Sequence, residues 1–264
     1  MVLLYFTLKD KIVKEAMGSL SPAGKNRDEC PVVVGGMAVQ LHCQDMIDRV
    51  RPTSDTDVIY IPEINSYSDF SSGIGGEIAE HIKSHGYQVA LKKVKHRPNC
   101  EVKIMDGQGN KAKERFFIHF DGVPTNKPKS CNINKRQVEN ASEIGYSGSS
   151  VYVLRPEDIL ASKLKRLKRK MIDAGDVSGL EQALFNTADS ARWSELAKTP
   201  LEPWLDHIID VQNSFPPEQV TLPTRYVIDK DFYDICLLAR KIEGTDGMFN
   251  KAYFANARNQ WSSL

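Results

Sequence analysis

The chain contains 264 residues, of which 41% are hydrophobic and 26% are charged. This composition is typical of a folded globular protein and excludes intrinsic disorder as its main state. Lysine and arginine number 35 against 34 acidic residues, which gives a formal net charge of +1. No overall basic excess therefore indicates nucleic-acid binding, and any such surface must be local.

The sequence shows no targeting segment and no pattern of paired cysteines. The opening apolar run, residues 2–6, is far shorter than the roughly 20 residues of a membrane-spanning helix, and no cleavage site follows it. The five cysteines are widely spaced and form no CxxC pair, so neither a disulfide framework nor a zinc ribbon is indicated. We expect a cytoplasmic protein with free thiols and no membrane partner.

The first 121 residues alternate between helical and strand patterns. A β-branched run, Val32 to Val34, stops at Gly35-Gly36, which predicts a buried strand followed by a tight turn. An Asp106-Gly107 pair predicts the turn of a hairpin. The expected helices are residues 8–20, 38–50 and 76–84, and the expected strands are residues 31–34, 55–61, 87–94, 101–105 and 115–121.

The pattern changes after a polar stretch at residues 122–150, which is the best candidate for a domain boundary. Short strands within this stretch are compatible with its length, because structureless loops of about 30 residues are uncommon. The remaining residues are almost entirely helical in pattern. The expected helices are residues 156–171, 173–185, 190–196, 203–213, 229–242 and 246–261.

Two acidic residues carry the clearest chemical signal. Asp55 and Asp57 lie two positions apart on an expected strand, so they point to the same face. Paired carboxylates repel each other unless a cation neutralises them, and oxygen ligands of this kind suit Mg²⁺ held together with substrate phosphates. Asp121, at the end of a later strand, could supply a third carboxylate, which predicts the two-Mg²⁺ apparatus of phosphoryl or nucleotidyl transfer.

Each of these acids also has an ordinary structural interpretation. A lone Asp-x-Asp is often a pair of solvated carboxylates at a strand edge. Asp121 precedes Gly122 and fits a turn residue equally well. The upstream glycine pair favours the functional interpretation, because residues without a Cβ let backbone N–H groups approach a triphosphate.

The order of these motifs resembles a known superfamily. Gly35-Gly36-x-Ala38 followed by Arg51-x-Thr53-x-Asp55-x-Asp57 is similar to nucleotidyltransferases with the polymerase-beta-like minimal fold. The closest similarity is to the AbiEii-type toxins of type IV toxin–antitoxin systems. Lys163-Leu164 on a helix, followed by Asp173-x-x-Asp176-Val177, also resembles that branch, so the resemblance covers roughly residues 30–180.

The resemblance implies both a fold and a set of roles. The fold would be α+β, with a polymerase-beta-like mixed sheet and flanking helices in a nucleotidyltransferase domain at residues 1–150 and a C-terminal helical domain at residues 151–264. The implied metal ligands are Asp55 and Asp57, with Asp121 added by its position in the pattern. The implied nucleotide-binding residues are Gly35, Gly36, Arg51, Thr53, Lys163 and Lys170, and Asp176 would be a catalytic or orienting carboxylate.

Some positions depart from the family pattern. Gly36 and Met37 stand where many members have serine, so a hydroxyl contact to phosphate is missing. The arginine that usually follows Lys-Leu falls on Lys170 or Arg169. A second Asp-x-x-Asp, Asp231 to Asp234, competes with Asp173 and Asp176 for the family signature.

Helical periodicity gives an independent view of Lys163. Leu160, Leu164, Leu167 and Met171 form one apolar stripe, and Lys163, Arg166 and Lys170 lie along one flank of it. A cationic row beside a buried stripe could neutralise a triphosphate or an RNA backbone. The alternative is a solvated face whose lysines extend to water.

These features predict a Mg²⁺-dependent enzyme that transfers a nucleoside monophosphate from an NTP to an acceptor hydroxyl. The resemblance implies RNA, such as a tRNA end, or a protein hydroxyl as the acceptor. It also implies an antitoxin protein as a binding partner. One alternative is a nucleotidyltransferase that modifies a small antibiotic-type molecule. Another is a catalytically silent protein of the same fold that only binds a partner.

Two histidines form a separate pattern. His81 and His85 lie one helical turn apart, and Glu77 lies one turn earlier. This spacing permits a metal site, but no HExxH motif and no outside ligand is evident. Exposed helix histidines are therefore the favoured interpretation.

Overall fold

The structure is a computed structural model that describes residues 5–22, 24–62, 66–93, 100–106, 114–122, 135–174, 193–214 and 223–262. The chain forms two compact units. The sheet unit comprises most of residues 1–41 together with 52–155, and the helical unit comprises residues 42–51 together with 156–264.

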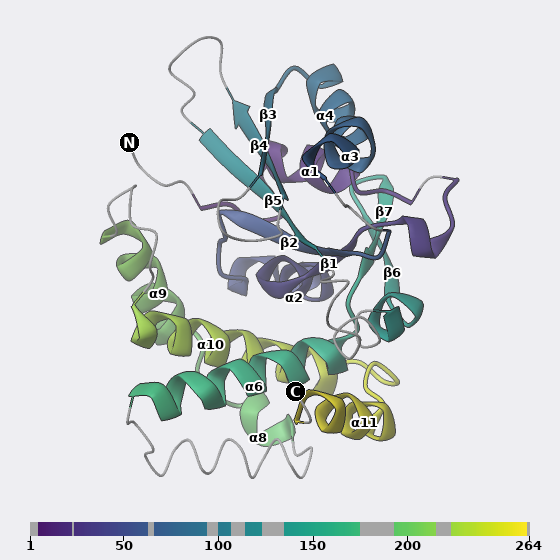
Figure 1. The fold of residues 1–264 in the computed structure, drawn as a ribbon. Coiled ribbons are helices and arrows are strands. Elements are labelled where there is room, and N and C mark those ends of the chain that lie inside the picture. Colours follow the sequence, from purple (N-terminus) through teal and green to yellow (C-terminus); the bar gives the residue numbers. More distant parts are fainter. Residues whose placement is uncertain are drawn as a thin grey trace. The chain divides into compact units, whose positions relative to one another are not determined.

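The sheet unit is built on a seven-stranded mixed sheet within the described residues (Figure 1). Its strand order is β3-β4-β5-β2-β1-β7-β6. The β2–β5 and β1–β7 pairs are parallel, and the other neighbouring pairs are antiparallel. The strands are β1 (Val32–Val34), β2 (Asp55–Tyr60), β3 (Gln88–Lys93), β4 (Cys100–Asp106), β5 (Glu114–Gly122), β6 (Ser142–Tyr146) and β7 (Ser149–Val153). A mixed sheet with helices confirms the α+β class.

One face of the sheet carries α1 (Lys11–Gly18), α3 (Tyr67–Ser72) and α4 (Ile74–Ser84) (Figure 1). Alternate residues of β4 and β5 face this layer and are fully buried, as in Ile104 and Ile118. Phe70 of α3 packs edge-on against Phe120 of β5, with 5.2 Å between the ring centroids. Because side chains alternate along a strand, the intervening residues of β4, β5 and β2 face away from this layer.

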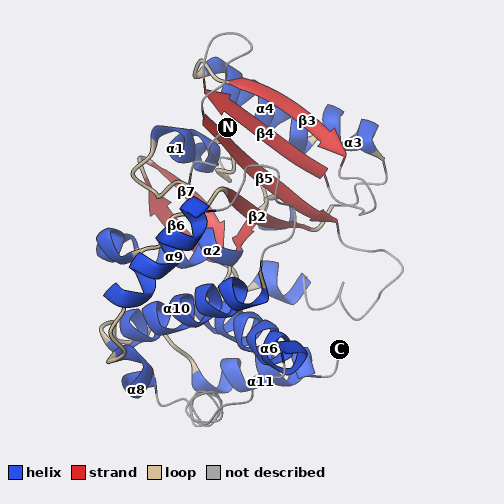
Figure 2. Cartoon of the chain, turned by 90° about the vertical axis from the view of Figure 1, so that its left-hand side faces the viewer, coloured by secondary structure: helices blue, strands red, loops and turns tan. Residues whose placement is uncertain are grey.

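The helical unit contains the longest helices of the described chain (Figure 2). Its helices are α6 (Pro156–Ala174), α8 (Trp193–Ala197), α9 (Glu202–Ser214), α10 (Thr224–Glu243) and α11 (Lys251–Ser262), with a short 3-10 segment, η2 (Gln44–Arg49). α10 packs against α6, α8 and α9. The predicted apolar stripe of α6 is buried, which confirms it as the packing face: Leu160, Leu164, Leu167 and Met171.

The domain change lies later in the chain than the sequence predicts. The expected boundary at residue 150 falls inside β7, because Tyr152 and Val153 pair with β1 and keep the chain in the sheet. The helical unit begins at Pro156, and residues 42–51 also belong to it. A single division of the chain therefore does not separate the two units.

Several elements differ in extent from the expected ones. The helix expected at residues 38–50 begins at Gly35 as α2 (Gly35–His42) and gives way to η2. The sequence patterns missed α3, and they missed a short 3-10 turn, η1 (Arg27–Glu29). Most of the helix expected at residues 173–185 lies outside the described residues.

The hydropathy of the helices and the state of the cysteines can be read from the described residues. None of the helices in the described ranges is long and apolar enough to cross a bilayer. Cys30, Cys43, Cys100 and Cys236 are buried free thiols. The structure of these residues therefore depends on packing and hydrogen bonding rather than on disulfides.

Candidate metal and nucleotide site

Asp55 and Asp57 lie on the same face of β2, as the Asp-x-Asp spacing predicts. Their side chains are 37% and 41% exposed, whereas Thr56 and Val58 between and after them are buried. This face is the one that does not carry the layer of α1, α3 and α4. The two carboxylates are thus accessible on the more polar side of the sheet.

His119 on β5 joins the two aspartates. The parallel pairing of β2 with β5 places His119 in register with Asp57. Its Nδ1 lies 3.5 Å from Asp57 Oδ1 and 3.7 Å from Asp55 Oδ2. Asp55, Asp57 and His119 each offer one ligand atom within 4.8 Å of the others, a spacing that a single cation could bridge.

Glu101 extends this group onto a third strand. The antiparallel pairing of β4 with β5 places Glu101 in register with His119, and its Oε2 lies 3.6 Å from His119 Nε2. Burial alone would lower the pKa of His119, but the nearby carboxylates of Asp57, Glu101 and Asp55 outweigh burial and raise it to about 10. A protonated imidazole therefore offsets part of the carboxylate charge when no metal is bound.

The turn after β1 brings backbone close to Asp57. Gly35 has a φ of +69°, in the left-handed region that favours glycine. A Cβ at this position would lie 2.9 Å from Asp57 Oδ2. Gly35 therefore provides both the turn into α2 and the space for the Asp57 carboxylate.

Thr53 supports Asp55 from the preceding turn. Its hydroxyl donates a hydrogen bond to Asp55 Oδ1 at 2.9 Å, and its backbone pairs with Phe6 in an isolated bridge. Thr53 is itself buried. The structure thus places this predicted nucleotide-binding residue as a direct support of one carboxylate.

Asp121 lies farther along β5. Its backbone is in register with Ile59, two residues beyond Asp57 on β2, and His119 occupies the position beside Asp57. The sequence pattern pointed to Asp121 as a possible ligand and not to His119, which lies two residues before it. Only the strand register distinguishes the two positions, and that register is a long-range property of the fold.

The predicted cationic residues of the helical unit form a different group. Arg51 is buried and makes two hydrogen bonds to Asp234, at 2.9 and 2.7 Å. Lys163 is also buried, and its Nζ lies 2.7 Å from Asp234 and 3.3 Å from Asp231. Arg166 binds Asp231 through its guanidinium.

This network links the Lys163 helix with the second Asp-x-x-Asp. Burial alone would raise the pKa of Asp231, but Lys163 and Arg166 lower it to about 2. The pKa of Asp234 is likewise lowered, against burial, by Arg51 and Lys163. Asp231 and Asp234 are therefore the acids that pair with Lys163 in the described part of the helical unit.

The remaining predicted residues are placed only in part. Gly36 is half-buried in the first turn of α2, and Lys170 is half-buried on α6. Asp173 belongs to the last turn of α6, and Asp176 lies outside the described residues. Their predicted roles stay predictions.

The sheet site fits a hard divalent cation. Its two half-exposed carboxylates offer oxygen ligands on one face, and the glycine turn leaves room beside them. Mg²⁺ is usually held by one or two protein carboxylates together with substrate phosphates, which this donor set matches.

Searches against protein-family models and against curated proteins return no match for the chain.

Proposed function

We propose that the chain is a Mg²⁺-dependent nucleotidyltransferase, which transfers a nucleoside monophosphate from an NTP to an acceptor hydroxyl and releases pyrophosphate. One observation carries this proposal: Asp55 and Asp57 lie half-exposed on one strand face beside the glycine turn of Gly35.

The charges favour a metal–triphosphate ligand. Two carboxylates within reach of one cation repel each other, and His119 offsets this repulsion in the metal-free chain. When bound, Mg²⁺ would neutralise triphosphate charge and activate the acceptor oxygen. Asp55 and Asp57 would hold it, and Thr53 would fix the orientation of Asp55 through its 2.9 Å hydrogen bond.

The glycine turn supplies the second part of a phosphate site. Gly35 and Gly36 open α2, and the N-terminus of a helix directs unpaired backbone N–H groups and a positive dipole end outward. Neither glycine has a side chain to obstruct a phosphate. The turn can therefore bind triphosphate oxygens next to the carboxylate that would hold the metal.

The order of elements in the sheet unit also favours the polymerase-beta-like fold. A strand, a glycine turn, a helix and then an antiparallel strand with Asp-x-Asp, paired in parallel with a later strand, is the arrangement expected for the polymerase-beta-like fold. The resemblance further suggests RNA, including tRNA, or a protein hydroxyl as acceptor. The roles of Lys163, Lys170 and Asp176 toward the nucleotide are part of this proposal as well.

The direct test is transfer of label from an NTP. The full chain is incubated with Mg²⁺, total RNA and each NTP in turn, labelled at either the α- or the γ-phosphate. We expect the α-label to appear on RNA or on protein and the γ-label to appear only in pyrophosphate. Transfer of the γ-label would indicate a kinase instead, and no transfer to RNA, protein or an added aminoglycoside would contradict the proposal.

A pair of variants connects any transfer to the site. Asp57→Ala removes a proposed ligand and should abolish transfer. Glu80→Gln changes an exposed carboxylate on α4 and should leave transfer unchanged.

A further inference from the structure

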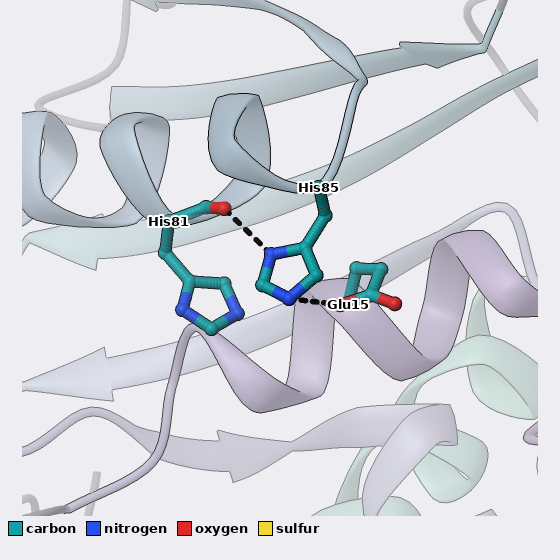
Figure 3. A group of neighbouring side chains, drawn as sticks. All are labelled: Glu15, His81 and His85. Carbon is teal, nitrogen blue, oxygen red and sulfur yellow. Dashed lines mark hydrogen bonds and ion pairs between the residues drawn. The ribbon is translucent and has the colours of Figure 1, made fainter.

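A second group of metal-binding side chains lies between α1 and α4, apart from the carboxylate site. Glu15 projects from α1, His81 lies in α4, and His85 caps the C-terminal end of α4. Each offers one ligand atom within 4.8 Å of the others. Figure 3 shows the three side chains in a row, with the His85 ring between the His81 ring and the Glu15 carboxylate.

Hydrogen bonding determines which nitrogen His85 can offer. Its Nδ1 lies 2.9 Å from the carbonyl oxygen of His81, which can only accept, so Nδ1 carries the proton. In the neutral ring the lone pair is then on Nε2, which faces Glu15 Oε2 at 3.4 Å. A backbone carbonyl that holds one imidazole nitrogen while the other binds metal is a common arrangement in metal sites.

His81 provides the second observation. Its Nε2 is buried and has no hydrogen-bond partner among the described residues. A buried polar atom without a partner is costly, and a metal ion would satisfy it.

The geometry and the donor set point to one kind of ion. A tetrahedral ion with ligands at about 2.0–2.1 Å separates them by about 3.4 Å, close to the distance between His85 and Glu15. Two imidazoles and one carboxylate are typical of Zn²⁺, whereas Mg²⁺ prefers oxygen ligands. The His85 side chain is 41% exposed, so a water molecule could complete the coordination.

We propose that Glu15, His81 and His85 form a Zn²⁺ site that ties α1 to α4 on the covered face of the sheet. The sequence revealed the spacing of the two histidines but not their third ligand, because Glu15 lies 66 positions before His81. The site is independent of the proposed nucleotidyl transfer. It would stabilise the sheet unit by binding the folded state alone.

Zinc binding to the full chain tests this proposal. The protein is made without a histidine tag, stripped with a chelator and titrated with Zn²⁺ in competition with a chromophoric chelator. All measurements use the Asp57→Asn background, which removes one of the three possible metal ligands of the carboxylate site. We expect one equivalent of Zn²⁺ to bind, and His81→Ala or His85→Ala to weaken binding at least tenfold.

Two further variants make each outcome decisive. Glu15→Gln keeps the shape of the side chain and removes its charge, so it should weaken zinc binding and abolish the rise in melting temperature that zinc causes. His207→Ala changes an exposed histidine of the helical unit and should leave both unchanged. No zinc binding before mutation, or equal binding by folded His81→Ala, His85→Ala and Glu15→Gln chains, would overturn the proposal.

Discussion

In the sheet site, the positive charge of one histidine lies close to the negative charges of three carboxylates. His119 lies within ion-pair distance of Asp55, Asp57 and Glu101, so one imidazolium neutralises part of a group of three carboxylates. A bound cation would supply the same compensation more strongly. The residues that contact the two aspartates are therefore as informative as the aspartates themselves.

A single substitution tests whether Asp121 is a third carboxylate ligand of the metal. If Asp121 completes the metal site, Asp121→Asn should raise the Mg²⁺ concentration needed for half-maximal transfer several-fold, because the amide keeps the shape and loses the charge. Affinity for the NTP itself should change less. The measurement is a Mg²⁺ titration of initial transfer rates.

Glu80→Gln serves as the control for Asp121→Asn. An unchanged titration in Asp121→Asn would return Asp121 to the role of a turn residue. The protein groups at the metal would then be Asp55, Asp57 and His119.

At the scale of elements, the turn from β1 into α2 determines how close the backbone comes to the metal site. Gly35→Ala introduces a Cβ 2.9 Å from Asp57 Oδ2 on a backbone with positive φ. We expect a loss of about 1–2 kcal/mol in stability from the backbone conformation, and a loss of transfer because the carboxylate must move. Thermal unfolding and transfer rates measure the two effects separately.

Gly86→Ala is the matched control. Gly86 also has a positive φ, of +89°, but a Cβ there would have no atom within 4 Å. This variant should lose stability and keep full activity. Equal activity losses in both variants would mean that the Gly35 effect is not specific to the site.

The α6–α10 contact supports a second element-scale prediction. Lys163→Ala leaves Asp231 and Asp234 with one cation fewer in a buried network, so we expect about 3 kcal/mol of destabilisation. Lys168→Ala, at an exposed position on the same helix, should cost less than about 0.5 kcal/mol. Urea unfolding followed by circular dichroism gives both values.

The same pair of variants tests the role implied by the resemblance. It predicts that Lys163→Ala weakens NTP binding by about 1 to 3 orders of magnitude, with about 1.4 kcal/mol per tenfold, and that Lys168→Ala does not. Titration of the folded protein with NTP measures this. Lost stability with unchanged nucleotide affinity would make Lys163 a purely structural residue.

Local sequence patterns predicted the positions of helices and strands better than the contacts between residues of different elements. The Val32–Val34 run, the Asp-x-Asp strand and the apolar stripe of α6 are short-range signals, and each is found at the expected place. His119 and Glu15 were missed, because their roles depend on strand register and on helix packing across long sequence separations. The periodicity of a sequence predicts which residues share one face of a helix or strand. Which residues contact that face depends on the tertiary structure.

At the scale of the whole molecule, the buried acids predict sensitivity to low pH. The pKa of Asp231 is lowered from its ordinary value of 3.8 to about 2, and that of Asp234 is lowered too. Groups with a depressed pKa stabilise the folded state above their unfolded pKa, and this contribution is lost as pH falls. We expect stability to decrease from about pH 4 toward pH 2, with Asp231 alone contributing about 2 kcal/mol.

Urea unfolding at pH 6, 4, 3 and 2, followed by the helical circular dichroism signal, measures this loss. The variant Asp231→Asn cannot titrate at this position and should show a smaller decrease over the same range. A free energy of unfolding that stays constant between pH 4 and pH 2 would contradict the assigned charges.

The proposed nucleotide site depends on a metal ion held by Asp55 and Asp57. Calorimetric titration of each NTP, with and without Mg²⁺, tests this claim without knowledge of the acceptor. We predict that Mg²⁺ tightens NTP binding at least tenfold, and that Asp55→Ala and Asp57→Ala lose this gain while Glu80→Gln keeps it. NTP affinity that is independent of Mg²⁺, or a full Mg²⁺ effect in the Asp55 and Asp57 variants, would contradict it.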